Sequence, residues 1–387
     1  MPHLTYVSPA AAVAVFLASA LAVAQLPTTA RADEPQPFLP NIDITSTIPA
    51  NGDLNPYGVA FVPADFPAGG PLNPGDILVS NFNNSGNTQG TGSTIIQFTP
   101  DDTVAPGVTA GQPGNATTFF QGRGLGLTTA LGVLTGGFVL VGNVPTSTSP
   151  GGTLTIQQGS LLILSRKGKQ LAALTNQLND PWDLTIDDEF DHATVFVSNV
   201  NNTTTPQKNG TVTRLTLAIS DTVTVTSTTV IASGYTVEPN AAALVLGPTG
   251  LAYDKSTDTL YVASTADNAI FAVPNAGSRS APPSGGTGTI IFRDDHLRGP
   301  LALVFAPNGD LITSNGDAVN ADPTQPSEIV EFTPAGQFVR QFNVDTGQGG
   351  AFGIGLAQIN TDTARLAVVD DNANDLIVID RHIPATN

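Results

Sequence analysis

The sequence predicts an all-β fold in which one structural unit occurs six times. The chain of 387 residues contains 39 Gly and 30 Pro, and Thr, Val and Ile fill the segments between them. This composition is typical of a protein made of short strands and many turns. After the N-terminal region, no long stretch carries the apolar periodicity of a helix. A pattern of three short strands recurs along the chain instead, which indicates a repeat architecture.

The clearest copy of the unit is residues 247–274, which read GPTGLAYDKSTDTLYVASTADNAIFAVP. Its strands are expected at residues 250–253, 259–263 and 269–273. Each is alternating or β-branched, and Asp, Asn, Ser and Thr separate them as turn residues.

The first strand of the unit follows a pattern of Pro, any residue, a small or turn residue, then apolar, small and apolar residues. Four copies begin at a proline, namely Pro56, Pro181, Pro248 and Pro300. Two looser copies, residues 122–127 and 351–356, lack the proline. A second strand follows in each copy and ends on one polar residue, in chain order Asn81, Asn143, Asn199, Ser264, Asn315 and Asp370. A third strand comes next, and five copies continue into a fourth.

A four-stranded antiparallel sheet repeated around an axis is a blade of a β-propeller. The sixth unit lacks residues for a fourth strand and would leave an unpaired, aggregation-prone edge. Residues 41–48, NIDITSTI, alternate with period two and have no partner of their own. We therefore expect a six-bladed β-propeller of four-stranded antiparallel blades, with its ring closed by the N-terminal strand completing the last blade.

The N-terminus predicts export. Residues 10–24 form an almost continuous apolar run that is too short to span a bilayer comfortably, and small-residue cleavage signatures follow it. We interpret residues 1–32 as a signal peptide and residues 33–387 as a single propeller domain, secreted or periplasmic. An uncleaved anchor is the alternative, and no membrane insertion is expected after cleavage.

Composition excludes several classes of function. The chain has no cysteine, so a thiol nucleophile, a thiolate metal site and a disulfide are impossible. Its formal net charge of −18 disfavours binding to nucleic acid. We expect a monomer whose partner is a small molecule, a glycan or an envelope protein.

The string Pro-x-Gly-apolar-Ala-apolar-Asp, then Leu-Tyr-Val-Ala and Asp-Asn-x-Ile, in residues 247–273 resembles the NHL repeat of six-bladed propellers. The resemblance implies the propeller fold. It implies little about function, because similar propellers serve as binding scaffolds, lactonases and lyases.

Two rings of side chains are expected at one face, where first strands start and second strands end. The residues after the proline position differ between units: Tyr57, Arg123, Trp182, Thr249, Leu301 and Phe352. Their variety favours a surface specialised for a ligand, to which Arg298 on the same face would contribute, although large residues could equally plug the channel. Long polar loops on this face also favour recognition.

The polar residues that end the second strands are nearly constant in type. Such Asn and Asp side chains commonly start a turn. Their oxygens are also what a hard cation requires, so Asp370 with Asn199 and Asn315, helped by Asp183, is the candidate site for Ca²⁺ or another divalent cation. No other cofactor is indicated.

His296 is the best candidate for a general base, because it follows Asp294 and Asp295 and leads into a first strand. Asp183 is the second candidate catalytic group. The architecture resembles gluconolactonase-like propellers, whose metal-binding Glu near the first blade is absent here, whereas Asn199 and Asp370 are compatible. It also resembles streptogramin-lyase-like propellers, whose catalytic histidines only His296 could match.

From the sequence, the expected function is a binding scaffold that uses one face of the ring. The alternative is a divalent-metal-dependent hydrolase, lactonase-like, or a lyase, with its site at the mouth of the central channel.

Overall fold

The computed structural model describes residues 40–100, 116–148, 154–201, 205–316, 326 and 328–383. Residues 40–387 group into one compact unit. The expected signal peptide, residues 1–32, lies outside the described part. Within the described part, there is no helix long and apolar enough to cross a membrane.

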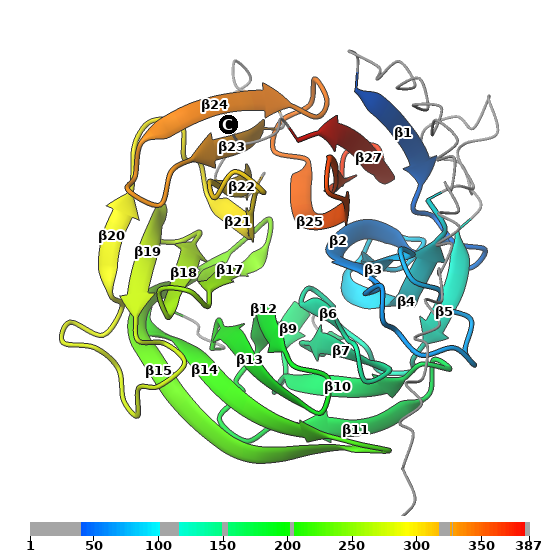
Figure 1. Cartoon of the computed structure of the whole chain (residues 1–387), viewed down its shortest axis with the longest axis horizontal. Coiled ribbons are helices and arrows are strands. Elements are labelled where there is room, and N and C mark those ends of the chain that lie inside the picture. The colour runs from blue at the N-terminus through cyan, green and yellow to red at the C-terminus, as the bar shows by residue number, and fades with distance from the viewer. Residues whose placement is uncertain are drawn as a thin grey trace, which may run out of the picture. The chain divides into compact units, whose positions relative to one another are not determined.

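The described strands form six antiparallel blades arranged in a ring, as Figure 1 shows. Blade 1 contains β2 (Leu54–Phe61), β3 (Ile77–Asn83), β4 (Gln89–Phe98) and β5 (Thr117–Gln121). Blade 2 contains β6 (Leu131–Leu134), β7 (Phe138–Asn143), β10 (Ser160–Ser165) and β11 (Gln170–Leu174), and the small hairpin of β8 (Thr146–Thr148) and β9 (Leu154–Ile156) is inserted in it. Blade 3 contains β12 (Pro181–Asp188), β13 (His192–Asn199), β14 (Gln207–Ile219) and β15 (Val223–Asn240), with β16 (Leu244–Leu246) added to β15.

The other three blades continue the same order from the inner strand outward. Blade 4 contains β17 (Pro248–Asp254), β18 (Thr259–Ser264), β19 (Ala269–Pro274) and β20 (Thr289–Phe292). Blade 5 contains β21 (Pro300–Phe305), β22 (Leu311–Asn315), β23 (Glu328–Phe332) and β24 (Phe338–Asn343). Blade 6 contains β25 (Ala351–Asn360), β26 (Thr363–Asp370), β27 (Asp375–His382) and, as its outer strand, β1 (Asn41–Ser46).

The closing strand pairs as the sequence predicts. β1 is antiparallel to β27, with Ile42 opposite Ile379 and Ile44 opposite Ile377. Figure 1 shows the blue β1 beside the red β27. The hydroxyl of Thr47 extends the pairing by donating to the carbonyl oxygen of Asn374 at 2.7 Å. The sheet edge that blade 6 would otherwise expose is therefore covered.

The core consists of apolar layers between neighbouring blades. Between blades 4 and 5, for example, Tyr261 and Ala263 of β18 share one buried cluster with Leu303 and Phe332. Phe332 is fully buried, which stabilises the fold by about 1.5–3 kcal/mol. Alternating apolar residues on the strands supply these layers, because successive side chains point to opposite faces of a blade.

Glycine recurs in the inner strands because neighbouring blades approach very closely there. A Cβ atom on Gly58 would lie 2.4 Å from the carbonyl oxygen of Thr129 in the next blade. A Cβ atom on Gly250 would lie 2.3 Å from the carbonyl oxygen of Leu301, and one on Gly353 would lie 1.7 Å from the carbonyl oxygen of Tyr57. The contact between blades therefore requires glycine at these three positions, two residues after the proline position.

A serine reinforces this contact. Ser80 Oγ accepts a hydrogen bond from Gly58 N at 2.9 Å and donates one to the Thr128 carbonyl oxygen in blade 2. Ser314 likewise bridges Ala302 N and the Phe352 carbonyl oxygen. Each serine thus ties its own inner strand to the next blade.

The inner strand of blade 2 does not lie where the sequence pattern placed it. The expected strand was residues 122–127, whereas β6 begins at Leu131. Thr129 faces Gly58 and so corresponds to Tyr57 in the ring. Arg123 lies exposed in the turn after β5 instead. This unit lacks the proline that marks the strand start in blades 1, 3, 4 and 5, and its glycines form a turn.

Candidate functional site

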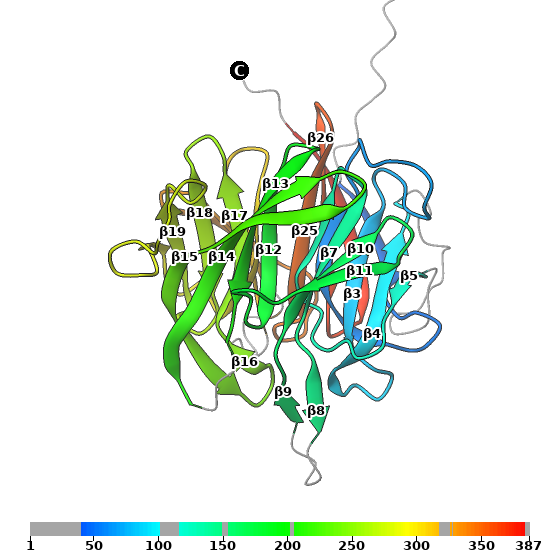
Figure 2. The same ribbon diagram turned by 90° about the horizontal axis from the view of Figure 1, so that it is seen from below.

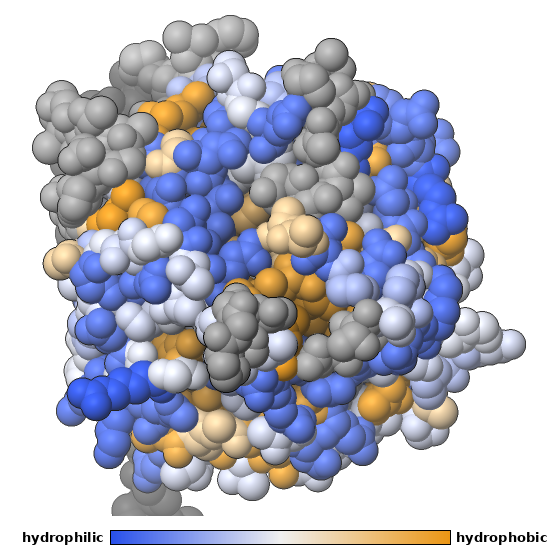
Figure 3. All heavy atoms as spheres, turned by 180° about the vertical axis from the view of Figure 1, so that it is seen from behind, coloured by the Kyte–Doolittle hydropathy of each residue, from blue (hydrophilic) through white to orange (hydrophobic). Residues whose placement is uncertain are grey.

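The candidate site is an apolar hollow at the mouth of the ring. The residues after the proline position converge there from blades 1, 3, 4, 5 and 6: Tyr57, Trp182, Thr249, Leu301 and Phe352. Phe82 and Leu127 complete the floor. Figure 3 shows an orange hollow surrounded by hydrophilic surface on this face. Five of the six residues expected in this ring therefore lie together at the mouth. Arg123, the sixth, is not among the lining residues.

Four aromatic rings fill the hollow from within. The ring centre of Tyr57 lies 5.6 Å from that of Phe82, 6.1 Å from that of Trp182 and 5.3 Å from that of Phe352. Trp182 Nε1 donates a hydrogen bond of 2.8 Å to the Tyr57 hydroxyl. All four are buried, and the indole N–H of Trp182 is satisfied within the cluster by the Tyr57 hydroxyl oxygen.

A hairpin from blade 3 covers the hollow. The turn between β15 and β16 brings Ala242, Ala243 and Val245 to its wall. Gln89 of blade 1 donates from Nε2 to the Ala242 carbonyl oxygen and so holds the hairpin across the mouth. Figure 2 shows β16 and the β8–β9 hairpin extending from the same end of the ring.

The enclosed volume is small. The hollow measures about 40 Å³. Small-molecule sites usually measure about 300–1,000 Å³, so this space admits a few water molecules but not an organic ligand of ordinary size. Entry of an organic ligand therefore requires movement of the 237–246 hairpin.

The polar residues that end the second strands bind the backbone. The Oδ1 atom accepts a backbone N–H from the loop before the inner strand in three blades: Gly126 N to Asn143, Asn179 N to Asn199 and Arg298 N to Asn315, at 2.9, 3.0 and 2.9 Å. Asn81 donates to the Thr47 carbonyl oxygen. All four side chains are buried, and the amide oxygens of Asn143, Asn199 and Asn315 fix the start of an inner strand.

Asp370 lies in a more acidic environment. Its Oδ1 accepts hydrogen bonds from Asn372 N and Ala373 N at 3.0 and 3.4 Å. Burial and the nearby charge of Asp345 raise the pKa of Asp370 to about 6. Burial also raises the pKa of Asp375 to about 6. Within the described residues, no group of three or more His, Asp or Glu side chains is placed to hold a metal ion.

Asp183 lies on the inner strand of blade 3, at the position that Gly58 and Gly250 occupy in other blades. Its carboxylate accepts hydrogen bonds from Leu184 N at 2.8 Å and from the backbone of Leu251 in blade 4. Burial raises the pKa of Asp183 to about 7, although these hydrogen bonds oppose the shift. Asp183 therefore bridges two blades, and it is not among the residues that line the hollow.

His296 and Arg298 lie in the segment between blades 4 and 5. The His296 ring stacks on Phe338 of the outer strand β24, with 3.7 Å between ring centres, and its Nδ1 lies 3.2 Å from Asp294 Oδ2. Arg298 is half-buried, and neither residue lines the hollow. The structure thus places His296 against an outer strand and Asp183 on an inner strand two blades away, so it does not bring them together.

Sequence reasoning missed the residues that close the hollow. Phe82 follows Asn81, the expected end of its strand, and Gln89 lies in a loop-like stretch of polar residues. Residues 244–246, Leu-Val-Leu, are an apolar run directly before an inner strand, and this was the one available signal for the covering hairpin.

The sequence matches no protein-family model and no curated protein. Among solved structures, a gluconolactonase from Xanthomonas campestris is 14% identical, covers 85% of this chain and 86% of its own, and has a TM-score of 0.47. A luciferin-regenerating enzyme is 10% identical over 88% of this chain and 95% of its own, with a TM-score of 0.45. A calcium-binding regucalcin from Agrobacterium tumefaciens is 13% identical over 87% of this chain and 92% of its own, with a TM-score of 0.42. These similarities carry no argument about function, and the fold rests on the strand pairing.

Proposed function

We propose that the chain is an exported binding propeller that takes a small molecule with an apolar face into the hollow at its mouth. The observation that carries this proposal is the cluster of Tyr57, Phe82, Trp182 and Phe352 beneath the 237–246 hairpin. The blades otherwise repeat, whereas this cluster does not. An apolar hollow on a hydrophilic face supports ligand binding, because such surfaces are rare on proteins without partners.

The hairpin would act as the cover of this site. Gln89 holds it with one solvent-exposed hydrogen bond, so displacement of the hairpin costs little compared with unfolding a blade. A ligand would replace the contacts that Ala242, Ala243 and Val245 make with the aromatic floor.

Trp182 is the sole tryptophan and therefore reports directly on this site. Acrylamide quenching of its fluorescence should be weak in the parent protein, because Trp182 is 5% exposed. Gln89→Ala should increase quenching by loosening the hairpin. Gln170→Ala, an exposed glutamine on β11, is the matched control and should not.

Ligands are then sought by titrating aromatic alcohols, alkyl glycosides and short oligosaccharides. A ligand of the mouth should shift Trp182 emission, raise the melting temperature and protect Trp182 from acrylamide. The proposal fails if no class changes the emission, or if Gln89→Ala and Gln170→Ala are quenched alike. Stabilisation without any change in Trp182 emission would place binding elsewhere, on the glycan- or protein-binding surface of the loops.

The metal-dependent hydrolase is the second candidate, and the raised pKa of Asp370 beside Asp345 favours it, because a cation would relieve this repulsion. The described donors do not complete a Ca²⁺ site, which needs six to eight oxygen ligands. We therefore derive no reaction step through a metal.

Calcium titration followed by melting temperature at neutral pH tests this candidate. A cation bound by Asp370 should raise the melting temperature, and Asp370→Asn should abolish the rise, whereas Asp362→Asn on the opposite face should keep it. An identical response to Ca²⁺ and to chelator in the parent protein removes the candidate.

A further inference from the structure

Blades 5 and 6 separate at the face opposite the mouth and leave a cleft of about 500 Å³. Apolar side chains of five strands, two from blade 5 and three from blade 6, line its walls: Ile312, Ile329, Leu356, Leu366 and Ile379. The cleft is far larger than the hollow at the mouth and shares no lining residue with it. Its volume lies within the range of about 300–1,000 Å³ that small-molecule sites occupy.

The cleft exists because the interface between these blades is packed at one end only. Near the mouth, Ala302, Ile354 and Val368 form a buried cluster. Ile312 and Leu356, toward the other face, are only partly buried against this cluster. Ile42 of the closing strand is 52% exposed at the edge of the cleft. Apolar surface that the described residues leave uncovered supports ligand binding.

The rim of the cleft carries positive charge. Two guanidinium groups line it, those of Arg340 on β24 and Arg381 on β27, and the imidazole of His382 also lines it. Glu331 is the acidic group on this rim; it lies opposite Arg340 in the sheet and accepts a hydrogen bond from Asn308 at 3.1 Å. This concentration of cationic side chains is unusual in a chain with 14 Lys and Arg against 32 Asp and Glu.

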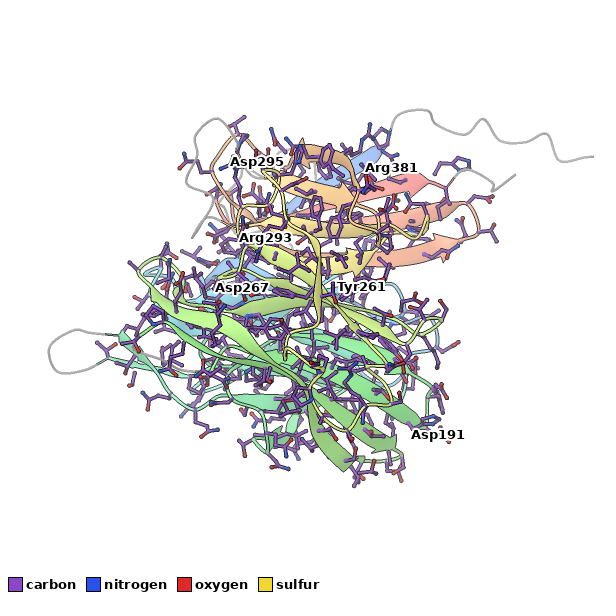
Figure 4. All side chains as sticks on the ribbon, turned by 90° about the vertical axis from the view of Figure 1, so that its left-hand side faces the viewer. Asp191, Tyr261, Asp267, Arg293, Asp295 and Arg381 are labelled. Carbon is purple, nitrogen blue, oxygen red and sulfur yellow. The ribbon has the colours of Figure 1, made fainter. Side chains whose placement is uncertain are left out.

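Arg381 is the group best placed to receive an anion. The neighbouring carboxylate of Asp380 is already bound by Arg365, at 2.6 and 2.8 Å. Among the described residues, no carboxylate lies within 4.0 Å of the Arg381 guanidinium. Figure 4 labels Arg381 on the red strands of blade 6, beside the orange strands of blade 5. A guanidinium without a partner binds a carboxylate through two parallel hydrogen bonds.

We propose that this cleft binds an amphipathic anion with an unbranched alkyl chain, of the fatty-acid type. The carboxylate would pair with Arg381 at the rim, assisted by Arg340. The alkyl chain would lie against Ile312, Leu356 and Ile379. Charge complementarity selects an anionic head, and the isoleucine and leucine side chains of the walls select an aliphatic tail.

Calorimetric titration of the full chain with octanoate, nonanoate and decanoate, below their micelle concentrations, tests the proposal. Each added methylene buried in the cleft should lower Kd about fourfold. Arg381→Gln should raise Kd for decanoate about tenfold or more, since a charged hydrogen bond is lost. Its Kd for 1-decanol, which has no carboxylate, should be unchanged.

Two further variants separate the cleft from general effects of charge. Lys167→Gln removes the same charge from an exposed turn of blade 2 and should leave binding unchanged. Ile42→Glu places a carboxylate at the cleft without disturbing the core and should weaken decanoate more than decanol.

Three results would overturn the proposal. The first is a Kd that does not depend on chain length, which would show an anion bound without its tail. The second is equal weakening by Arg381→Gln and Lys167→Gln. The third is no binding of any alkyl probe together with a change of oligomeric state in Ile42→Glu, which would show that a second copy of the chain covers the cleft.

Discussion

Replacing Asp183 by Asn should stabilise the protein at neutral pH. In the folded chain, burial raises the pKa of the Asp183 carboxyl from 3.8 to about 7. Each pKa unit between unfolded and folded states corresponds to about 1.4 kcal/mol, so ionised Asp183 costs at most about 4 kcal/mol. The residue keeps partial exposure, so the gain should be smaller than this bound. An amide oxygen can still accept the hydrogen bonds from Leu184 and Leu251.

The direction of the pH dependence follows from the raised pKa. Below pH 3.8, the carboxyl is protonated in both states, and its ionisation does not affect stability. Between pH 3.8 and about 7, the unfolded state loses the proton while the folded state keeps it, so stability falls as pH rises. The advantage of Asp183→Asn should therefore grow across this window and level off above pH 7.

The assay is the difference in melting temperature between Asp183→Asn and the parent protein, measured at several pH values from 4 to 8. Asp221→Asn, on an exposed turn of blade 3, corrects for the general loss of one negative charge. A difference that is constant with pH, or that shrinks as pH rises, would refute the assigned role of burial.

Three other changes test the architecture. Deleting residues 41–48 should expose the edge of β27 and remove the cooperative melting transition; unaltered calorimetric melting would contradict ring closure by β1. Gly353→Ala should cost about 3 kcal/mol in chemical denaturation because its Cβ would meet the Tyr57 carbonyl oxygen, whereas Gly86→Ala, in an open loop, should cost less than about 0.5 kcal/mol. Asn315→Ala should cost about 1–3 kcal/mol in the same assay, since two backbone groups lose their partner; a neutral effect would argue against a structural role.

The fold was predictable because each blade repeats the same local demands. β7, β13, β18, β22 and β26 end on the polar residues expected from the repeat, and the closing strand pairs where its alternation indicated. In blade 2, the sequence pattern placed Arg123 at the position that Thr129 occupies in the structure, an error of six residues. The glycines at 122–126 resemble the small residues of the repeat but do not make its contact between blades.

The candidate site was predictable only in part. The sequence indicated that Tyr57, Trp182 and Phe352 would meet, because their positions in the repeat are equivalent. It gave no sign that Gln89 would hold the hairpin of blade 3, since that contact joins residues 153 positions apart in different blades. The sequence made the amide oxygens of Asn199 and Asn315 candidate ligands for a cation. In the structure these oxygens accept backbone N–H groups, and the donors lie in loops whose path the sequence does not show.

The seam between β1 and β27 determines when the protein can finish folding. Thr47 and Asn374, which meet at this seam, are 327 residues apart in the sequence. Contacts this distant form late, and an incomplete sheet edge invites association with other chains until they do. The ring therefore cannot close until β27 is available to pair with β1, and until then each of these strands presents an unpaired edge.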